Sequence, residues 1–168
     1  MRTGIAAIAC VAIGCGDNSR PPPDASMRPP PPPCVATFAG NFAETAELAP
    51  GCATVSLAGA FALALPSMVL ATTDEISIDL DAAPTIGNYS SETVRTWSAQ
   101  ATLRHGSDVC IYLAGSSAVP PGSFTMAISE VDDARHTAHG TLVVQQNVLA
   151  GAETSCGAGT TEQVTVEF

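Results

Sequence analysis

The sequence predicts an all-β fold, either an antiparallel β-sandwich or a barrel-like domain. Three observations predict it: short stretches in which apolar and polar residues alternate, clusters of Gly, Pro and Asp between them, and no convincing helical period. The clearest stretch has Trp97, Ala99, Ala101 and Leu103 on one face and polar residues on the other. Strands of this kind bury one face each in a core between packed layers.

The expected strands follow one another from Cys34 to the end of the chain. The first covers 35–42, with Gly40 as an interruption, and leads into an acidic stretch at 44–47. Later alternating or apolar stretches lie at 76–80, 96–104, 109–113, 124–128, 137–149 and 164–168. Turns are expected at 50–51, 84–88, 106–108 and 120–122, and a polar hairpin loop at 131–135.

An uncharged segment from Leu48 to Thr73 has two readings. Its larger apolar residues fall on odd positions from Val55 to Leu65, which favours a strand with Gly59 as a bulge or bend. Part of the same set also fits helical spacing, so the state of 53–72 stays open between strand and helix. Pro66 and the many Ala, Ser and Thr residues argue against a membrane-spanning helix.

The first fifteen residues, MRTGIAAIACVAIGC, have the layout of a secretory signal. Arg2 is their only charge, and the apolar core is shorter than the roughly 20 residues that span a bilayer. The cysteine directly after Ile13-Gly14 resembles the acylation site of bacterial lipoproteins. The resemblance implies a signal peptide at 1–14 and lipidation at Cys15. A cut at Cys10 would leave a shorter core than signals have; an ordinary signal cut elsewhere is the other alternative.

That resemblance implies a protein of the cell envelope, anchored to a membrane through its N-terminal lipid. Gly16, in place of an acidic residue, favours the outer membrane, with the domain periplasmic or surface-exposed. Residues 15–33 form a Pro-rich linker that favours extended polyproline II, and 34–168 form one domain. The linker, the absence of lysine and the four remaining cysteines resemble small lipoproteins of GC-rich deltaproteobacteria such as myxobacteria, a likeness that implies no activity.

The charge balance excludes some partners. A formal charge of −10, with six Arg and no Lys, leaves nothing to neutralise a nucleic-acid backbone. It also argues against docking onto anionic lipid through a basic patch.

Four cysteines lie in the expected domain, an even number that predicts two disulfides in an exported chain. Three pairings exist. Cys34–Cys52 and Cys110–Cys156 are favoured because each pair lies at the edges of one predicted strand group. A zinc site is not expected, since no closely spaced Cys or His pairs occur.

Two polar groups are candidates for chemistry. Around the expected hairpin loop, four side chains could meet as metal ligands or acid–base groups; a solvated turn is the favoured reading. They are Asp132, Asp133, His136 and His139. Asp79 and Asp81 share one face of their expected strand, with two further acids at 74–75, and oxygen ligands of this kind could hold Ca²⁺. The spacing lacks the pattern of a calcium loop, so a solvated strand face is favoured there as well.

No catalytic motif accompanies these residues. The sequence has no Gly-x-Ser-x-Gly elbow, no His-Glu-x-x-His and no Gly-rich phosphate loop. With one Trp and two Tyr it lacks the aromatics that line glycosidase sites, and Trp97 is expected to be a core anchor. The expected function is a non-enzymatic envelope lipoprotein with a structural or interaction role, without cofactor, whose partner is an envelope protein or glycan. The alternatives are a sugar or small-ligand binder, with Ca²⁺ as its cofactor, and an envelope hydrolase.

Overall fold

The computed structural model describes residues 33–40, 43–66, 73–105, 108–149, 156 and 160–168. The predicted signal peptide, Cys15 and nearly all of the linker therefore lie outside the described residues. The described residues form eleven strands: β1 Cys34–Gly40, β2 Ala43–Leu48, β3 Ala53–Val55, β4 Ala60–Pro66, β5 Thr73–Asp79, β6 Gly87–Ser90, β7 Thr96–His105, β8 Asp108–Gly115, β9 Ser123–Asp132, β10 Thr137–Val148 and β11 Thr161–Glu167.

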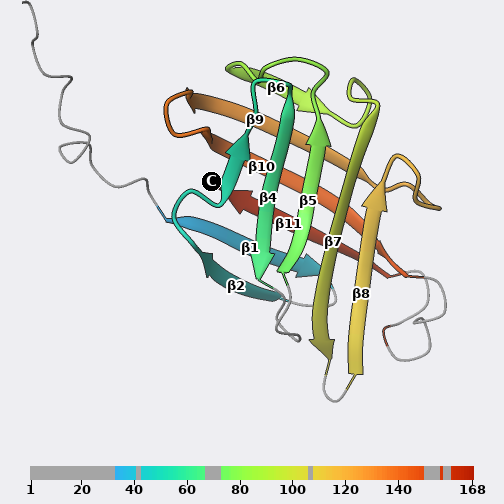
Figure 1. Cartoon of the computed structure of the whole chain (residues 1–168). Helices are drawn as coiled ribbons and strands as arrows, with labels where there is room; N and C mark the ends of the chain where they lie inside the picture. Colours follow the sequence, from blue (N-terminus) through green and yellow to red (C-terminus); the bar gives the residue numbers. More distant parts are fainter. Residues whose placement is uncertain (1–32, 41–42, 67–72, 106–107, 150–155, 157–159) are drawn as a thin grey trace, which may run out of the picture.

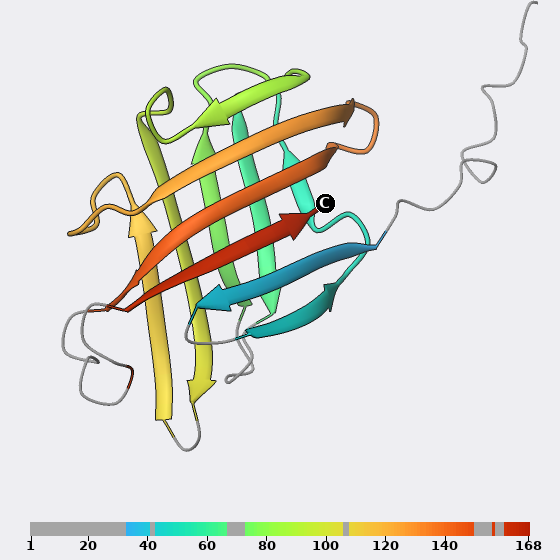
Figure 2. The ribbon, with the colours of Figure 1, turned by 180° about the vertical axis from the view of Figure 1, so that it is seen from behind.

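The strands form two layers, which confirms the all-β prediction (Figure 1). The front layer has the order β3-β4-β5-β7-β8, and the back layer has the order β2-β1-β11-β10-β9-β6. Every described pairing is antiparallel. β10 joins the layers at both ends, where Thr137 pairs with Thr54 of β3 and Val148 with Tyr112 of β8. The strands of the two layers cross steeply, as in orthogonal sheet packing (Figure 2).

The core lies between the layers and follows the predicted alternation. On β7, Trp97, Ala99, Ala101 and Leu103 are all buried, as expected from the sequence. The Trp97 ring meets Phe124 of β9 edge to face, with ring centroids 4.9 Å apart. Contacts of this type between the two layers make Trp97 the predicted core anchor.

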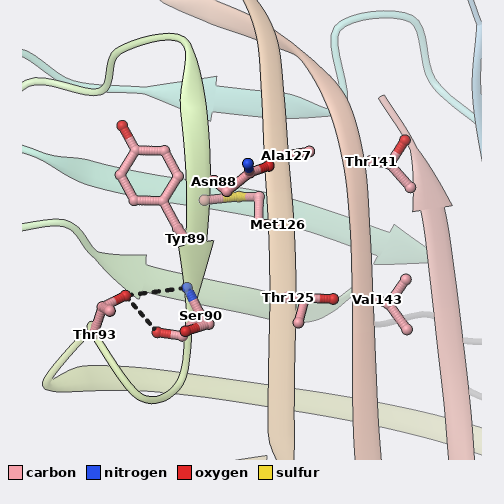
Figure 3. A pocket seen from close by; sticks show the side chains of 9 residues that line it. All are labelled: Asn88, Tyr89, Ser90, Thr93, Thr125, Met126, Ala127, Thr141 and Val143. Carbon is pink, nitrogen blue, oxygen red and sulfur yellow. Dashed lines mark hydrogen bonds between the residues drawn. The ribbon is translucent and has the colours of Figure 1, made fainter.

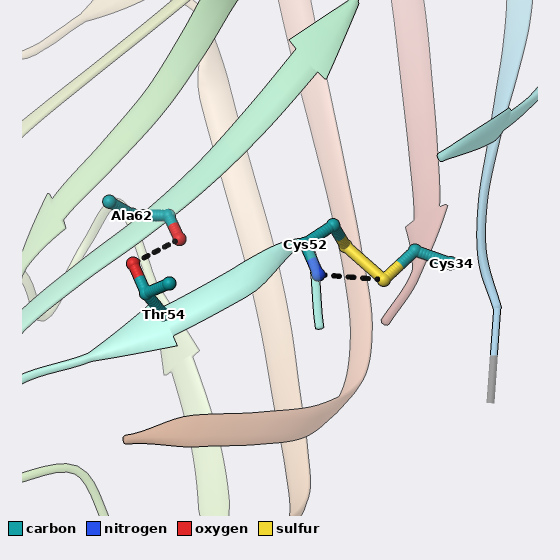
Figure 4. Close-up of a disulfide and its surroundings, with 4 residues drawn as sticks. All are labelled: Cys34, Cys52, Thr54 and Ala62. Atoms are coloured by element: carbon teal, nitrogen blue, oxygen red, sulfur yellow. Dashed lines mark hydrogen bonds between the residues drawn. A yellow bond between two sulfur atoms is a disulfide. The ribbon is translucent and has the colours of Figure 1, made fainter. Parts of the chain in front are cut away.

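Both disulfides have the predicted pairing. Cys34, at the start of β1, is bonded to Cys52, and the Cys52 amide donates a hydrogen bond to Cys34 Sγ at 3.3 Å (Figure 4). Cys110 of β8 is bonded to Cys156 in the connection between β10 and β11. Each bond links two segments of the domain that are distant in sequence, and so restricts the unfolded chain.

The uncharged segment forms strands in its described part. Val55 pairs with Phe61 across a tight turn, so β3 and β4 are a hairpin and the prediction of one bulged strand was wrong. Gly59 lies in that turn at φ 97°, where a side chain would meet the backbone of Ala82. Leu57 is consequently 71% exposed and does not share the buried face of Leu63. Residues 67–72 lie outside the described part.

Two further strands were not predicted. The acidic stretch at 44–47 belongs to β2, which pairs with β1 from Ala43 to Leu48. Part of the expected turn at 84–88 belongs to β6, which pairs with β9. Both are edge strands of the back layer, and neither has the alternation that marks a half-buried strand.

Candidate functional site

The predicted cluster around the β9–β10 connection is a capped turn. The Asp132 Oδ1 atom accepts hydrogen bonds from the amides of Ala134 and Arg135, at 3.1 and 3.2 Å, and Arg135 Nε lies 3.8 Å from Asp132 Oδ2. Asp133 and His136 are exposed, and His136 has a φ of 54°. The Asp132 carboxylate is therefore occupied by its own turn.

His139 lies apart from that turn, on β10 opposite Glu130. Its Nδ1 atom is buried and has no hydrogen-bond partner among the described residues. Its carbonyl accepts a hydrogen bond from the Ser129 hydroxyl at 3.0 Å. His136, by contrast, precedes β10, which begins at Thr137, so the two histidines do not lie on one strand.

The acidic residues that were predicted along the strand now described as β5 have separate roles. Asp79 ends β5, and its Oδ1 accepts the Asp81 amide at 3.1 Å in a turn where Asp81 has a φ of 60°. Asp81 lies beyond the strand, so the expected shared strand face is wrong. Upstream, Asp74 is buried and accepts hydrogen bonds from Gln100 Nε2 and from the amide and hydroxyl of Thr102. Within the described ranges, no three acidic, His or Cys side chains gather closely enough to hold a metal ion.

A different feature, a groove, lies on the outer face of the back layer (Figure 3). It encloses about 400 Å³ over β6, β9 and β10, a volume typical of small-molecule sites. Its lining is Asn88, Tyr89, Ser90, Thr93, Thr125, Met126, Ala127, Thr141 and Val143. No lining residue carries a charge. The groove is hollow because the outward side chains are small, whereas Tyr89 and Met126 pack against the core.

One wall of the groove is held by local hydrogen bonds. The Thr93 hydroxyl accepts from the Ser90 amide at 3.2 Å and donates to the Ser90 carbonyl at 3.1 Å (Figure 3). The Thr93 and Val94 amides also donate to that carbonyl, at 3.0 and 2.9 Å. This wall is therefore a closed turn that follows β6, and the position of its hydroxyl is set by the backbone.

The groove continues into a row of hydroxyl groups that crosses the back layer. Ser90 pairs with Thr125, and Figure 3 shows Val143 level with both on the next strand. Val143 pairs with Thr165, Thr165 with Thr37, and Thr37 with Thr45. We call this set the hydroxyl row: Ser90, Thr125, Thr165, Thr37 and Thr45, with Val143 as its one apolar member. All six side chains are exposed or half-buried.

Rows on either side of the hydroxyl row are also polar. Gln145 and Gln163 pair across β10 and β11, and Gln145 Nε2 donates to Gln163 Oε1 at 2.6 Å. Gln163 Nε2 in turn donates to the Thr165 hydroxyl at 3.3 Å. On the other side, Glu167 pairs with Thr141 and with Val35, and is exposed. The amides thus fix one hydroxyl of the row in place.

None of these residues is among the predicted site residues. Every second position of 141–147 and 161–167 is polar except Val143, and this alternation is the signal that marks an outward polar face. The row itself depends on the pairing of β1 with β11, whose members are more than a hundred positions apart. No local pattern reveals such a pairing.

Comparisons with protein-family models, curated proteins and solved structures found no match to this chain. In the described part of the chain, no helix has both the length and the apolar character needed to cross a membrane. The site therefore has to be interpreted from its own chemistry.

Proposed function

We propose that the protein is a non-enzymatic lipoprotein of the cell envelope. In this proposal Cys15 bears the lipid, residues 15–33 act as a spacer, and the sandwich presents its outer faces to other envelope components. The outer membrane is the preferred location, because Gly16 follows the lipid-bearing cysteine. The domain is periplasmic or surface-exposed.

The observation that supports this most directly is the cysteine arrangement. All four cysteines of the folded domain are paired with each other, in Cys34–Cys52 and Cys110–Cys156. Structural disulfides are typical of exported domains and rare in the cytosol. The first disulfide closes at the point where β1 begins, so the spacer joins a covalently stapled end of the sandwich.

A binding or display role is favoured over catalysis by the state of the acidic groups. Asp132 and Asp79 each cap a turn through their own neighbours, and Asp74 is buried under three hydrogen bonds. The groove on the back layer has hydroxyl and amide groups but no acid, base or nucleophile pair in its lining. Such a lining can hold a ligand by hydrogen bonds.

The proposal is tested by the intact mass of the full chain extracted from membranes of its native host. A mass that starts at Cys15 with two or three acyl chains is expected, and the two disulfides are expected to take up hydrogen on reduction. Cys15→Ser should yield no acylated species, whereas the matched variant Cys10→Ser should be acylated normally. An unacylated chain cut at another position would overturn the anchor.

A further inference from the structure

We propose that the back layer binds an extended, neutral polysaccharide, whose chain lies across the strands along the hydroxyl row with one end in the groove. This inference rests on the proposed function in one respect: an envelope location supplies a glycan. The binding surface itself consists of described residues alone.

Charge limits the class of ligand. The protein has a formal charge of −10, yet the groove lining and the hydroxyl row contain no charged side chain. An anionic ligand would be repelled by the field of the whole protein, and a cationic ligand would find no carboxylate in the groove. The groove lining and the hydroxyl row therefore match a neutral ligand, and the exposed carboxylates of this face, Glu167 and Glu47, lie in the adjacent row.

The hydrogen-bonding groups of the surface favour a sugar. Serine and threonine hydroxyls both donate and accept, and so do the amides of Asn88 and Gln163. Sugars present the same mixture of donors and acceptors along their whole length. Most of the surface that lines the groove is apolar; it includes Ala127 and Val143, and such surfaces suit the CH faces of a sugar ring.

The spacing of the hydroxyl row favours an extended chain. Neighbouring strands lie about 4.8 Å apart, so a row perpendicular to the strands offers a polar group at that interval. This interval is close to the length of one sugar unit in an extended chain. The row crosses six strands, from β6 through β9, β10, β11 and β1 to β2, and therefore matches a linear chain of several units better than a single sugar.

Two hydroxyls of the surface are preorganised. The Thr93 hydroxyl is fixed by the Ser90 backbone, and the Thr165 hydroxyl accepts from Gln163 within the Gln145–Gln163 pair. Groups that are already in place lose little conformational freedom when a ligand binds. In Figure 2 no described strand covers this face.

The composition of the face argues against a protein partner. The cores of protein interfaces are enriched in Trp, Tyr, Phe, Met and Arg. The hydroxyl row has none of these, and the two such residues that line the groove, Tyr89 and Met126, pack against the core. Binding of a second copy of this chain to the same face would contradict this reasoning, so the experiment has to distinguish it from glycan binding.

The test measures binding of the full chain, purified in detergent, to four defined oligosaccharides by calorimetry. Cellohexaose and chitohexaose are neutral and extended, maltohexaose is neutral and curled, and oligogalacturonate is extended and anionic. Binding of cellohexaose, of chitohexaose or of both is expected. Maltohexaose and oligogalacturonate are expected to bind more weakly or not at all.

Paired variants locate the surface. Thr125→Val together with Thr165→Val removes two hydroxyls at nearly constant volume and is expected to weaken binding by about tenfold to a hundredfold, since each hydrogen bond accounts for a factor of about three to ten. Thr96→Val on the exposed face of β7 is the matched control and should bind normally. Ala127→Trp should fill the groove and abolish binding, whereas Ala64→Trp, exposed on β4, should not.

Three outcomes would overturn this inference: no binding of either neutral extended probe, preferential binding of oligogalacturonate, or full binding by the Thr125/Thr165 variant. Self-association that Ala127→Trp abolishes, without glycan binding, would instead make the face an interface between two copies. The mass measurement is independent of all these results. Failure of glycan binding in an acylated protein would remove this inference alone, and an unacylated protein that binds glycan would remove only the anchor.

Discussion

Gln146 of β10 lies directly opposite Glu162 of β11, and both side chains are completely buried between the two layers. They occupy the inward positions that Leu142, Val144 and Val164 occupy further along the same strands. Gly40 of β1 pairs with Glu162 from the other side, and a Cβ at Gly40 would lie 2.7 Å from Glu162 Oε2. A polar pair thus replaces the apolar core at this end of the sandwich, and a glycine leaves space for the carboxylate.

The amide of Gln146 predicts a stabilising substitution. Neither its Nε2 nor its Oε1 atom has a hydrogen-bond partner among the described residues. Because an unsatisfied buried amide is costly, Gln146→Met, which keeps the shape, should raise the free energy of unfolding by about 1–3 kcal/mol. Urea unfolding of the oxidised protein measures this. The neighbour Gln145→Met loses its bond to Gln163 and should not stabilise. A less stable Gln146→Met would mean that the amide holds an ordered water.

Asp74 predicts a loss of stability. Its carboxylate lies where β5 and β7 separate, and it accepts the Thr102 amide at 2.6 Å, the Thr102 hydroxyl at 2.9 Å and Gln100 Nε2 at 3.1 Å. Asp74→Ala leaves the buried Thr102 amide without this acceptor and should lower the free energy of unfolding by about 2–4 kcal/mol. Glu75→Ala, one position along and exposed, should be within about 0.5 kcal/mol of wild type. Equal effects of the two substitutions in chemical denaturation would contradict this role.

The strands that the sequence predicts well are those with one face buried and the other exposed. On β9, Phe124, Met126 and Ile128 are all buried and alternate with exposed residues, so local pattern and tertiary environment agree. β2 was missed because an edge strand with little burial has no such pattern; Glu44 and Glu47 are both exposed. Charged residues on an edge strand also discourage pairing with another chain.

The candidate site could not be predicted from the sequence, for a different reason. Each member of the hydroxyl row is an ordinary exposed residue of its own strand, and only the register brings Thr37, Thr165 and Thr45 side by side. Conversely, the acids and histidines that the sequence does make conspicuous, such as Asp132, serve their own turns. The residue types of a sheet-face site carry little local signal when its members come from six strands.

The two disulfides should differ in their contribution. The residues of Cys34–Cys52 are separated by 18 positions and those of Cys110–Cys156 by 46. On the chain-entropy model these loops correspond to about 3 and about 4 kcal/mol, so replacing both cysteines of the second pair with Ala should be more destabilising. Thermal unfolding of the two double variants, with wild type reduced and oxidised, gives the order. The opposite order would show that the loss of stability on removal of each disulfide is governed by local packing around Cys34 and Cys52 and not by loop length.

Alanine substitutions at Gly140 and Gly87 can be compared to test the close contact between β9 and β10. Gly140 lies at the irregularity in the β9–β10 register, next to His139, and exchanges two backbone hydrogen bonds with Phe168. A Cβ there would collide with the Ala127 carbonyl oxygen, whereas a Cβ at Gly87 meets nothing within 4 Å. Gly140→Ala should therefore lower the free energy of unfolding by about 3 kcal/mol or more, because backbone on both sides has to move. Gly87→Ala should be neutral or slightly stabilising, through the lower entropy of its unfolded chain. If Gly140→Ala were as stable as Gly87→Ala in urea unfolding, the two strands could not approach as closely as described, and the floor of the groove at Ala127 would be wider than its lining indicates.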